Sequence, residues 1–205
     1  MSEQESSQER LRKQMDFIRE IDREKEVSRQ TYLADGSRKE DDAEHAWHLA
    51  VMAFLLAEYA NEDIDVFKTV KIVLIHDLVE IYAGDTYAYD TEGAKTQRSR
   101  EVAAANKLFS LLPQDQEQEL RRLWEEFEEA VTPEAKFART LDKFQPVVLN
   151  DASNGISWKE HGVYEQQILK RNEKTHEGSE TIWAYEKSLI DKNVKNGNIK
   201  DGNIR

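Results

Sequence analysis

Cysteine is absent from this chain of 205 residues, and glycine and proline are scarce, with 8 and 3 residues respectively. The absence of cysteine excludes disulfide bonds, thiolate zinc sites and cysteine nucleophiles, and it is typical of a reducing compartment. Long hydrophobic runs are also missing, because none approaches the roughly 20 residues that a membrane helix needs. The polar residues 1–10 do not resemble a signal peptide. We therefore expect a cytoplasmic protein that does not act in a membrane.

Basic residues are outnumbered by acidic ones, with 29 Lys and Arg against 41 Asp and Glu, which gives a net charge of −12. Such a surface repels the phosphate backbone of nucleic acids and anionic membranes. We therefore expect no nucleic acid among the partners. A small phosphorylated molecule can still bind where local cations or a metal ion reverse the field.

Alternating apolar and polar residues, the pattern of a half-buried strand, are hard to find in this sequence. Apolar residues instead recur every three or four positions, which predicts an all-α protein. The helices that we expect cover residues 9–27, 41–59, 65–82, 96–112, 114–130 and 133–151, with one or two more within 164–192. A polar segment over 28–41 and a loop over 83–93 separate some of them. Residues 1–192 are predicted to form one domain, and residues 193–205 a polar, frayed tail.

The predicted helix over residues 65–82 carries the strongest chemical signal. Its sequence over residues 70–81 is VKIVLIHDLVEI, in which His76, Asp77 and Glu80 interrupt an apolar run. On a continuous helix these three side chains lie within about 100° of one another and share a face. Burying two carboxylates is unfavourable unless they are paired or bind a metal ion. A network neutralised by a distant Arg or Lys and a metal site explain this helix equally well.

Two other helices contribute polar residues of the same kind. His45 and His48 are three positions apart and can point to one side of their helix. Asp142 stands among apolar residues, where by itself a salt bridge to Arg139 or Lys143 would explain it. Histidine nitrogens combined with carboxylate oxygens form a ligand set that suits Mn, Fe, Co, Ni or Zn. Considered together, the three helices favour a metal site.

These residues resemble the HD-domain superfamily of metal-dependent phosphohydrolases, whose pattern is a His, a His-Asp doublet and a distant Asp. The matching metal ligands are His45, His76, Asp77 and Asp142. The stretch HDLVEIYAGD, together with AEHAWHLA and TPEAKFARTLDKFQP, resembles the 5'-deoxynucleotidase branch of that superfamily. The resemblance implies a single-domain helical bundle that holds one divalent ion, with Mn, Co, Fe, Ni, Zn and Mg all open. It also implies hydrolysis of the phosphomonoester of (deoxy)nucleoside 5'-monophosphates and a homodimer.

The same resemblance assigns roles to residues outside the metal ligands. Glu80 and Asp85 occupy the positions of two acids that follow the doublet, and both are expected to be catalytic. Glu80 would position a water and help to move its proton, whereas Asp85 would orient the nucleophile or the sugar. Arg29 matches an arginine of the branch, and Tyr32 stands where relatives carry tryptophan. Both are expected to bind the substrate.

Other functions remain open from the sequence. The same scaffold could cleave another, signalling nucleotide, since a fold does not determine a substrate. A non-catalytic regulatory module could bind metal and nucleotide, and a helical scaffold could lack a metal altogether. Glu80 and Asp85 favour catalysis, because a purely structural metal site needs only its ligands.

Overall fold

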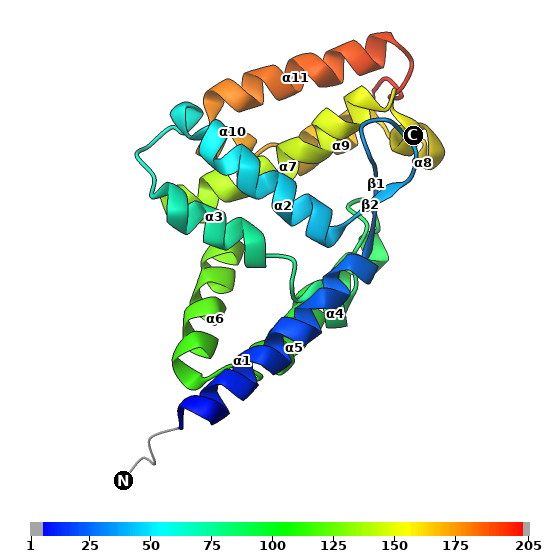
Figure 1. Ribbon diagram of the computed structural model, residues 1–205. Coiled ribbons are helices and arrows are strands. Elements are labelled where there is room, and N and C mark those ends of the chain that lie inside the picture. Colours follow the sequence, from blue (N-terminus) through cyan, green and yellow to red (C-terminus); the bar gives the residue numbers. More distant parts are fainter. Residues whose placement is uncertain (1–5, 203–205) are drawn as a thin grey trace.

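The computed structural model describes residues 6–202 and consists almost entirely of helices (Figure 1). In chain order the elements are α1 (Ser7–Ile21), the 3-10 helix η1 (Asp22–Glu26), β1 (Ser28–Tyr32), β2 (Lys39–Asp41), α2 (Asp42–Leu55), η2 (Ala57–Tyr59), α3 (Val66–Ile75), α4 (Glu80–Ala83), α5 (Thr91–Phe109), α6 (Gln114–Glu129), α7 (Pro133–Ala152), α8 (Ile156–His161), α9 (Glu165–Arg171), α10 (Thr175–Gly178) and α11 (Glu180–Lys195). The all-α prediction is confirmed, with one small sheet as the exception. Residues 1–5 of the predicted domain and 203–205 of the predicted tail lie outside the described residues.

Side chains that cap backbone N–H groups fix where α2 and α7 begin. Asp41 and Glu44 form a capping box at the start of α2, with the Glu44 N–H donating to Asp41 at 2.8 Å and the Asp41 N–H donating to Glu44 at 3.1 Å. Thr132 caps α7, and Pro133 occupies its first turn, where a missing N–H does no harm. The two helices that carry His45 and Asp142 therefore each begin at a residue that caps the first turn.

The segment predicted as one helix over residues 65–82 is interrupted. α3 ends at Ile75, the next four residues form turns, and α4 begins at Glu80. His76 Nδ1 donates to the carbonyl oxygen of Val73 at 2.8 Å, and this oxygen is the acceptor that a continuing helix would offer to the Asp77 N–H. The prediction of a continuous helix is therefore wrong, because a buried side chain takes over a backbone hydrogen bond.

The polar segment predicted over residues 28–41 contains a hairpin. β1 and β2 pair antiparallel, with Ser28 opposite Asp41 and Tyr32 opposite Lys39. Burial alternates along β1, but its buried side chains are Arg29 and Thr31, which are polar. A hydropathy pattern therefore could not reveal this strand.

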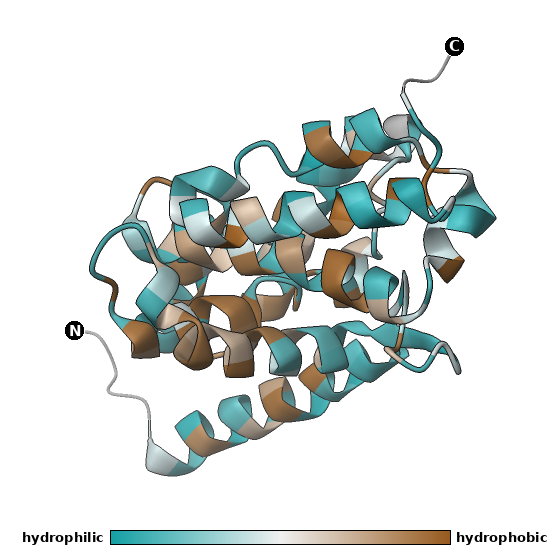
Figure 2. Cartoon of the chain, turned by 90° about the horizontal axis from the view of Figure 1, so that it is seen from above, coloured by the Kyte–Doolittle hydropathy of each residue, from teal (hydrophilic) through white to brown (hydrophobic). Residues whose placement is uncertain are grey.

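Within residues 6–202, the buried apolar residues form two clusters. The larger joins α2, α3, α7 and α11, and the smaller joins α1, α5 and α6 around Leu78 and Val79. α7 passes through the middle of the molecule, and twelve of its 20 residues are buried (Figure 1). Figure 2 shows brown, hydrophobic stretches alternating with teal, hydrophilic ones along most of the helices. Polar residues on the buried faces of α2 and α7 thus meet inside the protein.

The segment after residue 192 is packed against the fold over its described part, in contrast to the predicted fraying. α11 continues to Lys195, and Ile199 is only 3% exposed. The Lys200 N–H donates to the Val163 carbonyl at 3.0 Å, and the Glu165 N–H donates to the Lys200 carbonyl at 2.9 Å. The buried Ile199 and Asn193, together with backbone and side-chain hydrogen bonds, hold a segment that is polar in composition.

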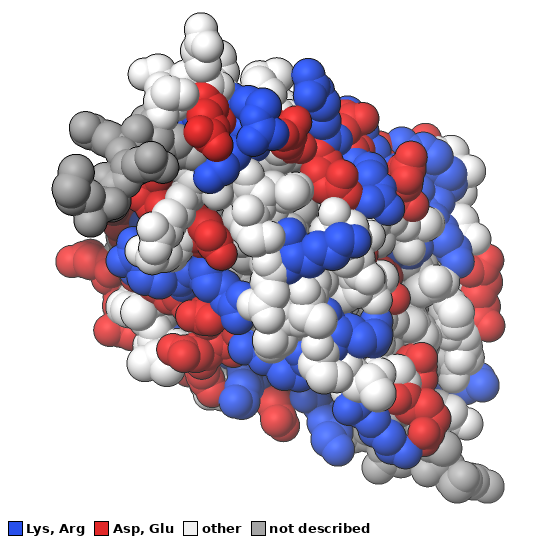
Figure 3. All heavy atoms as spheres, turned by 90° about the horizontal axis from the view of Figure 1, so that it is seen from below, with Lys and Arg blue, Asp and Glu red and all other residues white. Residues whose placement is uncertain are grey.

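The surface charge is mixed rather than concentrated on the face seen in Figure 3, where acidic and basic side chains are interspersed. None of the helices within residues 6–202 has the length and apolar character that crossing a membrane requires.

Candidate metal centre and adjoining cavities

Three of the four predicted metal ligands converge in the structure. His45 lies on α2, His76 follows α3 and Asp142 lies on α7, and each offers a ligand atom within 4.8 Å of the others. The Asp142 Oδ1 atom is 3.3 Å from His45 Nε2 and 3.9 Å from His76 Nε2. All three residues are buried, so two imidazoles and a carboxylate face one another away from water.

Asp77, the fourth predicted ligand, lies at the edge of this cluster. Its Oδ2 atom is 3.0 Å from His76 Nε2 and 3.9 Å from His45 Nε2. The same oxygen accepts a hydrogen bond from Arg29 Nη1 at 2.9 Å. The structure therefore brings all four side chains together, with Asp77 shared between the cluster and an arginine.

The orientation of both imidazoles fits a bound metal ion. His45 Nδ1 donates to Gln145 Oε1 at 3.0 Å, and Gln145 Nε2 donates to Glu40 Oε2 at 2.9 Å. His76 Nδ1 is fixed by the Val73 carbonyl, and its buried Nε2 atom, although 3.0 Å from Asp77 Oδ2, is not aligned for a hydrogen bond with any of residues 6–202. Metal-binding histidines are commonly held in this way, with one nitrogen hydrogen-bonded and the other facing the ion. The residues present therefore fit a divalent ion.

The electrostatics of the cluster favour a cation. Burial, together with the charge of Arg29, lowers the pKa of His45 to about 4, which keeps it neutral as a ligand must be. Burial acts to lower the pKa of His76 as well, but Asp77 and Asp142 outweigh it and raise this pKa to about 9. The negative potential that holds a proton on His76 is equally suited to hold a divalent ion.

Two basic side chains balance the acids around the cluster. Arg29 Nη1 lies 3.0 Å from Asp42 Oδ1 as well as 2.9 Å from Asp77, and Lys143 Nζ lies 2.9 Å from Asp142 Oδ2. Burial opposes the ionisation of Asp142, but Lys143 and the two histidines hold the pKa of Asp142 well below its ordinary value. The sequence left open whether a distant arginine or lysine neutralises the buried acids or whether they bind a metal ion. Arg29 is such a distant cation, and it lies beside the cluster of metal-ligand candidates.

The predicted catalytic acids lie beside the cluster. Glu80 is the first residue of α4, and its buried Oε2 atom has no hydrogen-bond partner within the described residues. Burial and the nearby Asp77 raise the pKa of Glu80 well above its ordinary value. Burial also raises the pKa of Asp85, against the opposing charge of Arg29. A carboxylate in such surroundings is a good proton acceptor.

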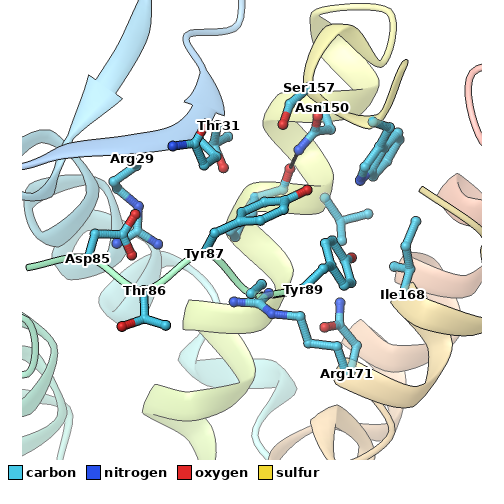
Figure 4. A pocket seen from close by; sticks show the side chains of 16 residues that line it. Arg29, Thr31, Asp85, Thr86, Tyr87, Tyr89, Asn150, Ser157, Ile168 and Arg171 are labelled. Atoms are coloured by element: carbon cyan, nitrogen blue, oxygen red, sulfur yellow. Dashed lines mark hydrogen bonds between the residues drawn. The ribbon is translucent and has the colours of Figure 1, made fainter. Parts of the chain in front are cut away.

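Two cavities meet at this place. The metal-side cavity has among its walls Arg29, His76, Asp77, Glu80, Asp142 and Lys143. The tyrosine-lined cavity, shown in Figure 4, has among its walls Tyr87, Tyr89, Asn150, Ser157, Trp158 and Ile168. Arg29, Asp85, Thr86 and Arg171 line both cavities. A ligand can therefore contact the charged cluster and the aromatic walls at once.

Comparison with known proteins identifies the family of this chain. The HD domain family profile matches residues 21–183. The chain belongs to the HD domain family. The bovine 5'-deoxynucleotidase HDDC2 is 32% identical over 136 residues, and its human counterpart is 31% identical over 136 residues, with 65% of this chain covered in each case. The matches cover 64% and 65% of those two proteins, so the chain spans just under two thirds of their length.

A solved structure resembles this HD domain over almost its whole length. A protein described as a predicted metal-dependent phosphohydrolase from Magnetospirillum magnetotacticum MS-1 is 45% identical, with a TM-score of 0.90, and the match covers 95% of this chain and 98% of that one. A conserved hypothetical protein from Pyrococcus furiosus, at 23% identity and a TM-score of 0.60, shares the fold. The HD-domain membership predicted from the sequence is confirmed.

Tyr32 is the predicted site residue that this HD domain places elsewhere. The alternation of β1 buries Arg29 and Thr31, which line the tyrosine-lined cavity, whereas Tyr32 lies outside both cavities. Its hydroxyl donates to Glu160 Oε1 at 2.8 Å. A contact of Tyr32 with the substrate stays a prediction from the sequence.

The sequence did not reveal several residues that line the cavities of the HD domain. The tyrosines of the predicted 83–93 loop were visible as a group, but nothing indicated that Tyr87 and Tyr89 form a wall. Arg171 ends a short helix in a polar stretch that carries no recognisable motif. Only the folded chain brings it to the metal-side cavity.

Proposed function

We propose that this HD domain hydrolyses the phosphomonoester bond of nucleoside 5'-monophosphates, with deoxynucleotides as the preferred class. The observation that carries the proposal is the cluster of His45, His76, Asp77 and Asp142 beside Glu80, at the junction of a charged and an aromatic cavity. Two relatives at 31% and 32% identity bear the name 5'-deoxynucleotidase, which supports the same reaction.

These four residues would hold a divalent ion, which would lower the pKa of a water molecule and polarise a phosphoryl oxygen. His45 and His76 would offer Nε2 to the ion, because Gln145 and the Val73 carbonyl hold their Nδ1 atoms. Imidazole and carboxylate ligands suit Mn, Fe, Co, Ni or Zn, and Mg remains a candidate.

The remaining chemistry belongs to side chains of the chain itself. Glu80 accepts the proton of the attacking water, a role for which its raised pKa suits it. Asp85, which lines both cavities, orients the water or the sugar. Arg29 also lines both cavities, and it supplies positive charge beside the phosphate while it holds Asp77 in place. The role of Tyr32 in binding the substrate rests on the family resemblance alone.

The test starts from protein freed of metal by a chelator and reloaded with Mn²⁺, Co²⁺, Zn²⁺ or Mg²⁺. Phosphate release is measured with ribo- and deoxynucleoside 5'-monophosphates and with nucleotides that carry more phosphates. Asp142→Asn, which changes one ligand atom, controls for contaminating phosphatases. If the metal-loaded protein binds nucleotides but releases no phosphate from any of them, the domain is a regulatory module and the proposal is wrong.

We also infer that two copies of the chain associate. Trp47 and Phe54 on α2 are 64% and 56% exposed, and Phe67 on the adjoining α3 is 70% exposed. Exposed apolar groups of this size commonly mark protein–protein contacts. Sedimentation of the wild type and of Phe67→Asp tests this association. A cytoplasmic location, and a single domain over residues 1–192, remain predictions from the sequence.

A further inference from the structure

Arg171 stands at the junction of the two cavities. It is the last residue of α9, and its side chain extends toward the segment that carries Asp85, Thr86 and Tyr87 (Figure 4). Within residues 6–202 its guanidinium donates no hydrogen bond and forms no ion pair, although its charge acts on the nearby Asp85. A half-buried guanidinium with five N–H donors and no protein acceptor is ready for a ligand.

The other cations of the metal-side cavity are engaged. Arg29 pairs with Asp42 and Asp77, and Lys143 pairs with Asp142. Arg139 Nη1 donates to the Glu128 carbonyl at 3.0 Å. Among the described residues that line this cavity, Arg171 is therefore the cation that can give all its donors to a phosphate. Guanidinium groups bind phosphate oxygens in pairs, which fixes position as well as affinity.

The tyrosine-lined cavity beyond Arg171 offers a place for a flat, polar group. Tyr87 and Tyr89 meet edge to face at 5.4 Å, and the ring of His161 lies 4.4 Å from that of Tyr87. Asn150 Nδ2 donates to the Pro146 carbonyl at 2.8 Å, which fixes the amide orientation. The buried Asn150 Oδ1 has no partner within residues 6–202. A nucleobase provides both a face for the tyrosines and N–H donors for this oxygen.

We propose that Arg171 binds the phosphate of the substrate and that the nucleoside extends from it into the tyrosine-lined cavity, with the base against Tyr87. This placement rests on the proposed function, because it assumes that the substrate is a nucleotide. It gives the substrate a direction, with the phosphate between the metal cluster and α9 and the base toward α8.

The first test removes the charge of Arg171 in the metal-loaded protein. Arg171→Ala should weaken the binding of inorganic phosphate, measured by calorimetry, and lower kcat/KM for dAMP, each by about 10- to 100-fold, the usual effect of losing charged hydrogen bonds. Lys170→Ala is the matched control, because Lys170 is exposed and lines neither cavity. It should change both quantities less than about twofold, and guanidinium ions added to Arg171→Ala should restore part of its activity.

Arg171→Gln preserves most of the side-chain volume and keeps the test decisive if the alanine variant is unstable. Metal content and circular dichroism verify that each variant is folded and loaded. Wild-type phosphate affinity in a folded Arg171→Gln variant would overturn the role of Arg171. A wild-type protein that binds phosphate through Arg171 but hydrolyses no nucleotide would contradict the proposed function alone.

The second test separates the base from the phosphate by means of 2-deoxyribose 5-phosphate, which has no base. Tyr87→Ala should raise KM for dAMP by about tenfold, in line with the loss of base stacking, and leave KM for the sugar phosphate nearly unchanged. Tyr87→Phe keeps the ring and should resemble the wild type. An equal effect of Tyr87→Ala on both compounds would place the base outside this cavity.

Discussion

The two cavities that meet at Arg171 are built from different kinds of side chain. The metal-side cavity is lined mainly by charged side chains, some of them paired, with Arg29 beside Asp77 and Lys143 beside Asp142. The tyrosine-lined cavity is walled by rings and amides, and Asn150 Oδ1 lacks a partner among the described residues. Fixed charges in a buried site can stabilise a reaction, whereas rings and amide groups recognise the shape and the hydrogen-bonding groups of a ligand. The difference indicates that chemistry and recognition are divided between the two cavities.

The division of roles between the two cavities is tested most strongly by removing one of the paired charges of the metal-side cavity. Asp77→Ala removes a proposed ligand and leaves Arg29 without one of its acceptors. We expect the variant to lose its metal, measured by elemental analysis, and its phosphate release to fall to background. Asp63→Ala, at an exposed position, is the control. Stoichiometric metal with full turnover in Asp77→Ala would show that Asp77 is no ligand.

Glu80→Ala should separate turnover from metal binding within the metal-side cavity. Because Glu80 is assigned to the water rather than to the ion, metal content should stay near that of the wild type. Phosphate release should fall by roughly 10²-fold, the usual effect of removing a positioned acid–base group. Glu80→Gln preserves the shape and should lose as much. Unchanged kcat in both variants would assign the proton transfer to another residue.

A smaller effect is expected behind the tyrosine-lined cavity, where Glu186 is fully buried and hydrogen-bonded to Asn172. Burial raises the pKa of Glu186 from 4.5 to about 7. A carboxyl with a raised pKa contributes stability at low pH, and this contribution is lost as the pH rises through about 7. Relative to Glu186→Gln, the wild type should therefore lose about 1–3 kcal/mol of unfolding free energy between pH 5 and pH 8.

Urea denaturation at the two pH values measures this difference for Glu186→Gln. Glu58→Gln, at an exposed position, is the matched control. A stability difference between wild type and Glu186→Gln that does not change with pH would mean that Glu186 is ionised throughout, and that the wall of the tyrosine-lined cavity tolerates a charge.

The smallest effect belongs to Tyr32, which lies outside both cavities. Tyr32→Phe removes one hydrogen bond to Glu160 and should change KM for dAMP by less than about twofold, because surface hydrogen bonds contribute little. Steady-state kinetics of Tyr32→Phe and of Tyr87→Ala, measured side by side, compares the two values of KM. A large rise in KM for Tyr32→Phe would require β1 to turn its other face to the substrate.

The residues of the motif could be predicted because each of them stands in a recognisable local pattern. His45, the His76–Asp77 doublet and Asp142 are polar positions on otherwise buried segments, and such positions need partners inside the fold. The caps of α2 and α7 were also local. These features could be predicted from neighbours in the sequence.

The features that were missed depend on contacts between distant segments. Arg29 pairs with Asp77, 48 positions away, and no local pattern reveals that contact. The break after Ile75 follows from a side chain competing for a backbone carbonyl, which apolar periodicity does not register. Arg171 acquires its place only when α9 packs beside the metal-side cavity.

The packing of residues 199–200 has a practical consequence for anyone who shortens or tags this protein. Lys200 is bonded to Val163 and Glu165, and these residues lie just before and at the start of the helix that ends at Arg171. A version that stops at residue 192 would leave this helix with a loose first turn and expose the pocket that Ile199 fills. An affinity tag at the N-terminus would leave these contacts of Ile199 and Lys200 intact during purification.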